Sequence, residues 1–135
     1  MRKLSAFAIV VALAGCSSAK DVTAAEDATA HFHRLLDAGK FAEIYTDASP
    51  ELHRVTPEPR FVALLSAVHR KLGTVRRSDN QGWNVNYGTS GGFATLTYKT
   101  QFTAGPAQET FVYRLSKGQA QLVGYNINSD LLIIN

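Results

Sequence analysis

The sequence has little cysteine and little net charge. Cys16 is the single cysteine among 135 residues, so no disulfide can form within the chain. The 14 basic residues exceed the 11 acidic ones, but two of them, Arg2 and Lys3, stand at the amino terminus. Without residues 1–15 the balance is 12 basic against 11 acidic residues, a net charge of +1. A near-neutral body has little attraction for polyanions, so no nucleic-acid partner is expected.

Long hydrophobic runs are also missing. The most apolar stretch, residues 4–13, spans about ten residues and would extend roughly 15 Å as a helix, about half of a bilayer core. It is therefore too short for a normal membrane-spanning helix. Arg2 and Lys3 precede it and small residues follow it, which predicts a secretory signal peptide over residues 1–15.

The end of this leader, Leu13-Ala14-Gly15-Cys16, resembles the bacterial lipobox in position, order and hydrophobic lead-in. The resemblance implies cleavage before Cys16, diacylation of that residue and acylation of the new amino terminus by fatty chains such as palmitate. Two or three acyl chains hold a protein stably at a membrane, whereas one chain holds it only marginally. The alternative is a soluble secreted protein with an incidental cysteine.

Ser17 rather than aspartate follows the cysteine. This resembles the signal for transport to the outer membrane, so we expect a lipid-anchored lipoprotein on the periplasmic face of the outer membrane, with the inner membrane as the alternative. Residues 16–22 are predicted to form a lipidated tether, which reaches about 20 Å when extended. Residues 23–135 are predicted to form a single domain that works close to the bilayer.

Three helices are predicted in the first half of this domain. The first begins at the capping box Thr23–Glu26 and stops before Gly39. The second is short and begins near Phe41, and the third begins at a cap and two prolines in residues 56–59 and ends at Gly73. The buried stripes contain Ala25, Ala28, Phe32, Leu35 and Leu36, then Phe41, Ile44 and Tyr45, then Phe61, Leu64, Leu65, Val68 and Leu72. Residues 51–55 fit either a helical turn or an extended segment.

The second half alternates large apolar and polar residues, which is typical of half-buried strands. About five antiparallel strands are predicted, in residues 73–78, 83–87, 93–102, 107–115 and 120–129. Helices followed by strands define an α+β domain, with three N-terminal helices packed on one face of a curled antiparallel sheet. The apolar tail, residues 131–134, is predicted to continue the last strand or to cover the core, and the alternative is a contact with a partner or ligand.

Recognisable catalytic and metal-binding patterns are absent. His31 and His33 are two positions apart and so point to different sides of a helix, and His53 and His69 stand alone. We interpret these histidines as surface or capping residues, and no metal or cofactor is predicted. A cluster of basic residues at Arg70, Lys71, Arg76 and Arg77 is predicted to be a solvated rim, or else a contact with anionic lipid.

A candidate pocket is formed by Tyr98, Tyr113 and Tyr125 at inward-facing strand positions, together with Glu109. An isomerase or dehydratase would need such an acid or base beside a hydroxyl that holds an oxyanion. The alternative is that these tyrosines are core aromatics with a hydrated hydroxyl, and we favour this interpretation.

Scattered residues resemble the nuclear transport factor 2-like superfamily, a cone-shaped α+β fold, and its small bacterial lipoproteins in particular. They are Phe32, Ala38-Gly39-Lys40-Phe41, Ile44-Tyr45, Phe61, Leu65, Lys71-Leu72-Gly73, Thr97-Tyr98, Phe102, Glu109-Thr110-Phe111 and Gly124-Tyr125-Asn126-Ile127. The resemblance implies a sheet and helices that enclose a pocket, and relatives use this pocket in different ways.

Together these features predict a lipid-anchored cell-envelope lipoprotein whose domain binds a small apolar ligand or an envelope protein and is not an enzyme. The alternative is a small pocket enzyme of the isomerase, dehydratase or hydrolase type. A deep polar cavity would favour the enzyme, whereas a filled core with an exposed apolar patch would favour the binding protein.

Overall fold

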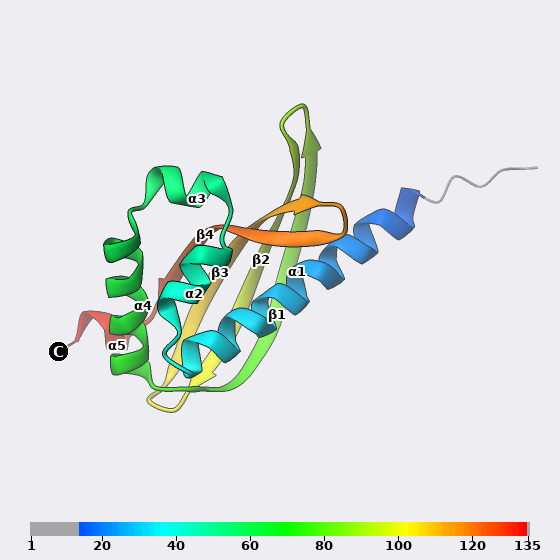
Figure 1. The fold of residues 1–135 in the computed structure, drawn as a ribbon. Coiled ribbons are helices and arrows are strands. Elements are labelled where there is room, and N and C mark those ends of the chain that lie inside the picture. The colour runs from blue at the N-terminus through cyan, green and yellow to red at the C-terminus, as the bar shows by residue number, and fades with distance from the viewer. Residues whose placement is uncertain (1–13, 135) are drawn as a thin grey trace, which may run out of the picture.

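One antiparallel sheet and five helices make up the structure, a computed structural model that describes residues 14–134. The helices are α1 (Ala14–Asp37), α2 (Phe41–Asp47), α3 (Pro50–Val55), α4 (Glu58–Leu72) and α5 (Asp130–Ile133). The strands are β1 (Val75–Gly88), β2 (Gly91–Phe102), β3 (Pro106–Ser116) and β4 (Gln119–Asn128). The predicted α+β class is confirmed, with four strands in place of about five (Figure 1).

The sheet is a meander in the order β1-β2-β3-β4, so β1 and β4 are its edges. The two strands predicted at residues 73–78 and 83–87 form one long strand, and the predicted turn between them is wrong. Residues 79–82 instead contain a bulge, in which the Gly82 amide donates to Oδ1 of Asn80 at 2.8 Å. The Asn80 side chain thus accepts from a backbone amide at the bulge, and pairing with β2 continues on both sides of it.

Helix α1 begins at Ala14, well before the predicted start at Thr23. The two side chains of the predicted capping box bind elsewhere. The Thr23 hydroxyl donates to the Ala19 carbonyl at 3.0 Å, and Glu26 accepts from the Asn80 side chain at 3.0 Å. Residues 17–22, predicted as part of a tether, are therefore helical and continuous with the helix of the domain.

The helical segments after α1 follow the predicted breaks more closely. Gly39 and Gly73 have φ angles of 72° and 81°, in the region that favours glycine after a helix. The ambiguous residues 51–55 are helical, within α3, where Ser49 is the N-cap. The third predicted helix is α4, which begins at Glu58 after Pro57 without a side-chain cap bond from the predicted cap, Thr56.

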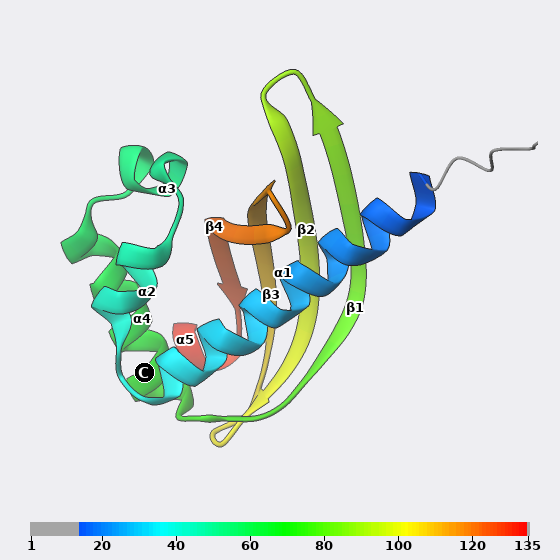
Figure 2. The same cartoon turned by 45° about the vertical axis from the view of Figure 1, so that its right-hand side comes forward.

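Helix α1 crosses one face of the curved sheet, and α2 and α4 lie together beside its C-terminal part (Figures 1 and 2). Alternate residues of β2 and β3 face this side and are buried. The core contains Ala25, Phe32, Leu36, Ile44, Leu52, Phe61, Leu65, Val68, Leu72, Leu96, Phe102, Phe111, Tyr113 and Leu122. The face that α1 covers is the one that the period of two had indicated.

The apolar tail does not extend the last strand. Ser129 caps the short helix α5, which lies against α4, and Lys71 donates to the Leu132 carbonyl at 3.2 Å. Leu131 and Leu132 pack against the core, whereas Ile133 and Ile134 are 76% and 68% exposed. The tail thus covers the core with its first two leucines and leaves two isoleucines exposed.

Candidate functional site

A buried polar network is centred on Glu109, whose side chain is fully buried on the helix-facing side of β3. Oε1 of the carboxylate lies 2.8 Å from Nε2 of His33 and accepts from the Thr100 hydroxyl at 2.5 Å. Oε2 accepts from the Tyr125 hydroxyl at 2.6 Å. A buried carboxyl group needs polar partners, and these three converging groups satisfy it in place of water.

His33 is buried, although the sequence predicted it at the surface or at a helix cap. It is 7% exposed on α1, so the interpretation of a surface or capping histidine is wrong for this residue. The signal that would have found it is helical spacing. Ala25, Thr29 and His33 follow one another at intervals of four residues, and all three are buried. Thr29 and His33 are thus polar residues on the same buried stripe as Ala25. His31, by contrast, is exposed as expected and lies 3.9 Å from Asp47.

The structure buries Tyr98 and Tyr113 and half-buries Tyr125, and the hydroxyls of Tyr113 and Tyr125 have different partners. The Tyr113 hydroxyl bonds to Thr29 at 2.7 Å, while Tyr125 donates to Glu109. Burial raises the pKa of Tyr98 to about 12 and raises the pKa of Tyr113 as well. Burial, with the nearby Glu109 carboxylate, raises the pKa of Tyr125 well above its ordinary value. Each phenol is thus held in its neutral form.

Aromatic rings fill the space beside the carboxylate. The ring of Phe111 lies 5.1 Å from that of Phe32, 5.2 Å from that of Tyr125 and 5.7 Å from the imidazole of His33. Phe32 also contacts Tyr125 at 4.7 Å between ring centroids. This packing leaves the network as a polar seam within a filled core, and a substrate would have to displace aromatic side chains to reach Glu109.

A surface groove lies between α3, α4 and the edge strand β4, with a volume of about 510 Å³. It is lined by Leu52, Val55, Thr56, Arg60, Phe61, Leu64, Val123, Gly124 and Tyr125. Val55 is 76% exposed and Leu64 is 41% exposed, which makes the groove and its rim an exposed apolar patch. Tyr125 joins the groove to the buried network, because its ring lines the first and its hydroxyl belongs to the second.

Two contacts hold α3 beside the sheet and so shape one wall of the groove. The Ser49 amide donates to the Leu122 carbonyl on the edge of β4 at 2.9 Å. Glu51 pairs with Arg114 of β3. A hydrogen bond with its own backbone and the Arg114 partner lower the pKa of Glu51, against the opposing effect of burial.

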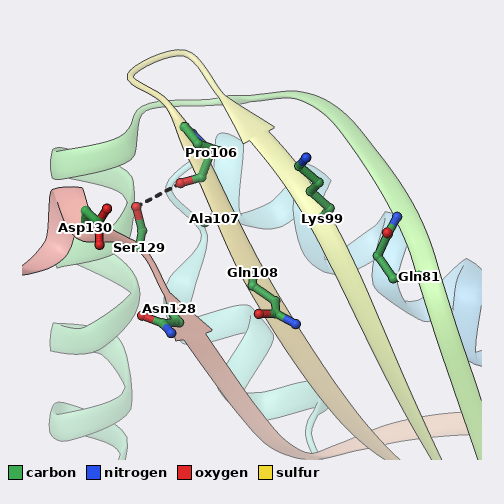
Figure 3. A pocket seen from close by; sticks show the side chains of 8 residues that line it. All are labelled: Gln81, Lys99, Pro106, Ala107, Gln108, Asn128, Ser129 and Asp130. Carbon is green, nitrogen blue, oxygen red and sulfur yellow. Dashed lines mark hydrogen bonds between the residues drawn. The ribbon is translucent and has the colours of Figure 1, made fainter.

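A second hollow, of about 380 Å³, lies on the outer face of the sheet (Figure 3). Its lining is mainly polar: Gln81, Lys99, Pro106, Ala107, Gln108, Asn128, Ser129 and Asp130. Ser129 donates to the Pro106 carbonyl at 2.9 Å, and Lys99 and Asp130 stand at opposite sides of the hollow. Its exposed side chains do not converge on one point as the partners of Glu109 do.

The predicted lipidation site lies at the start of the described chain. Ala14, Gly15 and Cys16 begin α1, whereas Leu13 and the predicted signal sequence before it fall outside the described residues. No helix within residues 14–134 is long and apolar enough to cross a membrane. Over the same residues, no three histidine, cysteine or acidic side chains are grouped to hold a metal ion.

The fold and site define a small α+β domain in which helices cover a four-stranded meander around a buried acid–histidine network. Residues 28–125 match the model of a family described as "Protein of unknown function (DUF4019)", and the chain belongs to that family. The fold is similar to that of a solved protein from Catenulispora acidiphila, at 20% identity and a TM-score of 0.54. That match covers 84% of this chain and 94% of the other. Comparison with curated proteins gives no match.

Proposed function

We propose that this protein is a lipid-anchored envelope lipoprotein, held by acyl chains on Cys16 at the periplasmic face of the outer membrane, whose domain binds another protein and is not an enzyme. The lipobox-like sequence Leu13-Ala14-Gly15-Cys16 supports the anchor. The nuclear transport factor 2-like superfamily remains our proposal for its wider relationship, supported by a curved antiparallel sheet with helices on one face.

The observation that carries the binding role is the contrast between core and surface. Glu109 and His33 are enclosed by packed rings, while apolar residues that could have been buried, Val55 and Leu64, stand exposed beside an edge strand. Exposed apolar patches of this kind usually mark contacts with other molecules. A closed core and an open apolar groove favour binding over catalysis.

An extended apolar segment of an envelope protein fits the groove best. Among the described strands, β4 has a neighbour on one side only, so its other edge offers backbone groups for pairing. The bond from the Ser49 amide to the Leu122 carbonyl uses this edge at one position, and residues 123–125 continue it along the groove. A peptide that pairs there would place alternate side chains against Val55, Phe61 and Leu64.

Site-specific crosslinking in cells tests this role. A photoreactive residue at Leu64, in the groove, should give a discrete adduct that maps to a peptide of one envelope protein. The same residue at Gln108, exposed on the outer face of the sheet, is the control and should not. An adduct with a small apolar molecule would contradict peptide binding and show that the groove binds a small ligand instead. No position-specific adduct at Leu64 would contradict a binding role for the groove.

One observation favours the second candidate, a small pocket enzyme of the isomerase, dehydratase or hydrolase type. Tyr125 both donates to Glu109 and lines the groove, so its movement would connect a buried acid and histidine to bound substrate. An activity that is abolished by Glu109→Gln and Tyr98→Phe, in variants that remain folded, would support the enzyme over the binding protein.

A further inference from the structure

Two large aromatic side chains of β1 are exposed on the stretch that runs along the first half of α1, where Asn80 bonds to Glu26 and Tyr87 bonds to Asp21. Trp83, the chain's single tryptophan, is 55% exposed and Tyr87 is 59% exposed. Trp83 pairs with the buried Leu96 and Tyr87 with Gly92, so both aromatic residues lie on the face of the sheet that α1 crosses. Val85 between them packs against the core, which fixes this orientation.

Tyr87 contacts α1 close to Cys16. Its hydroxyl donates to the carboxylate of Asp21, and the Ser18 side chain is near enough to act on the same hydroxyl. Helix α1 is continuous from Ala14, so Asp21 stands five positions after Cys16, a rise of only about 7–8 Å along the helix axis. The backbone between Cys16 and the Tyr87 contact is therefore helical rather than an extended tether.

Helices α4 and α5 lie far from the start of α1 and from the end of β1, which carries Tyr87 (Figures 1 and 2). The β1–β2 hairpin and the start of α1 both project from the domain, away from α4 and α5 (Figures 1 and 2). The basic cluster of the sequence analysis is also distant. Asp37, at the other end of α1, accepts from the Val75 amide next to Arg76 and Arg77, roughly 30 Å along the helix from Cys16.

Charge near the anchor end is mixed. The β3–β4 turn at Gly118 adjoins Lys20 of α1, and both Lys20 and Lys117 are exposed. Two acidic residues of α1, Asp21 and Asp27, balance their positive charge. A balanced set of this kind gives little attraction to anionic lipid. Tryptophan and tyrosine, however, favour the headgroup region of a bilayer irrespective of its charge, because each ring has an apolar body and a polar edge.

We propose that Trp83 and Tyr87 form a membrane-contacting face that inserts into the headgroup region of the same leaflet that holds the acyl chains of Cys16. This inference rests on the proposed lipid anchor. It gives the anchored domain one orientation, with the aromatic face on the lipid and the groove of α3, α4 and β4 at a distance from the membrane. It also moves the lipid contact from the basic cluster at Arg76 and Arg77 to the opposite end of α1.

Fluorescence of the single tryptophan tests this face directly. The mature protein, purified from bacterial membranes with its acyl chains, is placed in phosphatidylcholine vesicles whose lipids carry bromine near the headgroup. We expect about half or more of the Trp83 emission to be quenched and the remainder to shift to shorter wavelength. The matched control is Trp83→Phe combined with Leu64→Trp, which moves the tryptophan to the groove and should leave the emission unquenched.

The outcomes separate this inference from the anchor on which it rests. If the protein floats with vesicles and Trp83 emission is unchanged, the anchor stands and the aromatic face is wrong. If Cys16 carries no acyl chains and the protein does not float with vesicles, the anchor and the aromatic face are both wrong. Quenching of Trp83 that persists in 1 M salt, where the screening length falls to about 3 Å, supports the aromatic contact over an electrostatic one.

Discussion

Nε2 of His33 lies 2.8 Å from Oε1 of Glu109, although 76 positions separate the two residues in the chain. The contact joins α1 to β3 inside the core, where both side chains are almost completely buried. A buried polar pair tolerates few alternative arrangements, because each group left without a partner carries its full desolvation cost. The pair therefore fixes how α1 lies along the sheet.

Removal of one partner should destabilise the fold strongly. His33→Leu leaves the Glu109 carboxylate buried without its nitrogen partner, and we expect a loss of about 3–5 kcal/mol in the free energy of unfolding. The measurement is urea denaturation followed by circular dichroism. His31→Leu is the matched control on the exposed side of α1 and should change stability by less than about 0.5 kcal/mol. Equal effects of the two substitutions would contradict a structural role for the pair.

Stability should fall at alkaline pH because the buried phenols are held neutral. Tyrosine in the unfolded chain ionises near pH 10, whereas burial raises the pKa of Tyr98 to about 12. The unfolded state thus loses its proton first, and stability present below pH 10 is lost as pH rises toward 12. Because solvent screens part of this shift, Tyr98 contributes at most about 2–3 kcal/mol to the loss. Denaturation measured from pH 8 to 12, alongside tyrosinate absorbance, gives the slope.

The matched variant for this pH dependence is Tyr98→Phe, which keeps the ring and removes the ionising group. Its stability should decline less steeply above pH 10 than that of the wild type, while Tyr113 and Tyr125 still contribute because their pKa values are raised too. An unchanged slope would show that Tyr98 is not protected from ionisation in the folded protein.

Replacement of the proposed anchor should change where the protein is found. Cys16→Ser removes the thiol that would carry the diacyl group, and we expect the variant in the soluble periplasmic fraction rather than in membranes. Cell fractionation measures the distribution, and mass spectrometry of the natural protein should show an acylated amino terminus at Cys16. Ser17→Ala is the control and should remain with the membranes. A Cys16→Ser protein that stays membrane-bound, or a natural protein with an unmodified start, would overturn the anchor.

The two halves of the apolar tail should respond differently to truncation. Leu131 is half-buried, and its side chain packs where a Cβ on Gly105 would stand, so Leu131→Ala should cost about 1–2 kcal/mol of stability. Ile134→Ala, at a side chain that is 68% exposed, should be nearly neutral in the isolated protein. Thermal unfolding compares the two variants. A larger effect of Ile134→Ala would mean that the exposed end of the tail is part of the folded core.

Local patterns predicted much of the architecture. The alternation of β2 and β3 identified their buried faces, and Gly39 and Gly73 marked helix ends because their φ values of 72° and 81° are strained for other residues. The same local reasoning failed at Thr23 and in residues 79–82. There, capping and turn residues make other contacts, and both Glu26 and Asn80 take part in the hydrogen bond that joins α1 to β1.

The sequence by itself determined the α+β class, the inward parity of Glu109 and the place of Cys16 after the apolar residues 4–13, because each depends on neighbouring residues and their period. Only the tertiary structure decided that His33 meets Glu109 and that Tyr87 contacts α1 at Asp21. Those contacts depend on how a long helix crosses the sheet. That crossing is set by packing among residues far apart in the chain, and no local pattern encodes it.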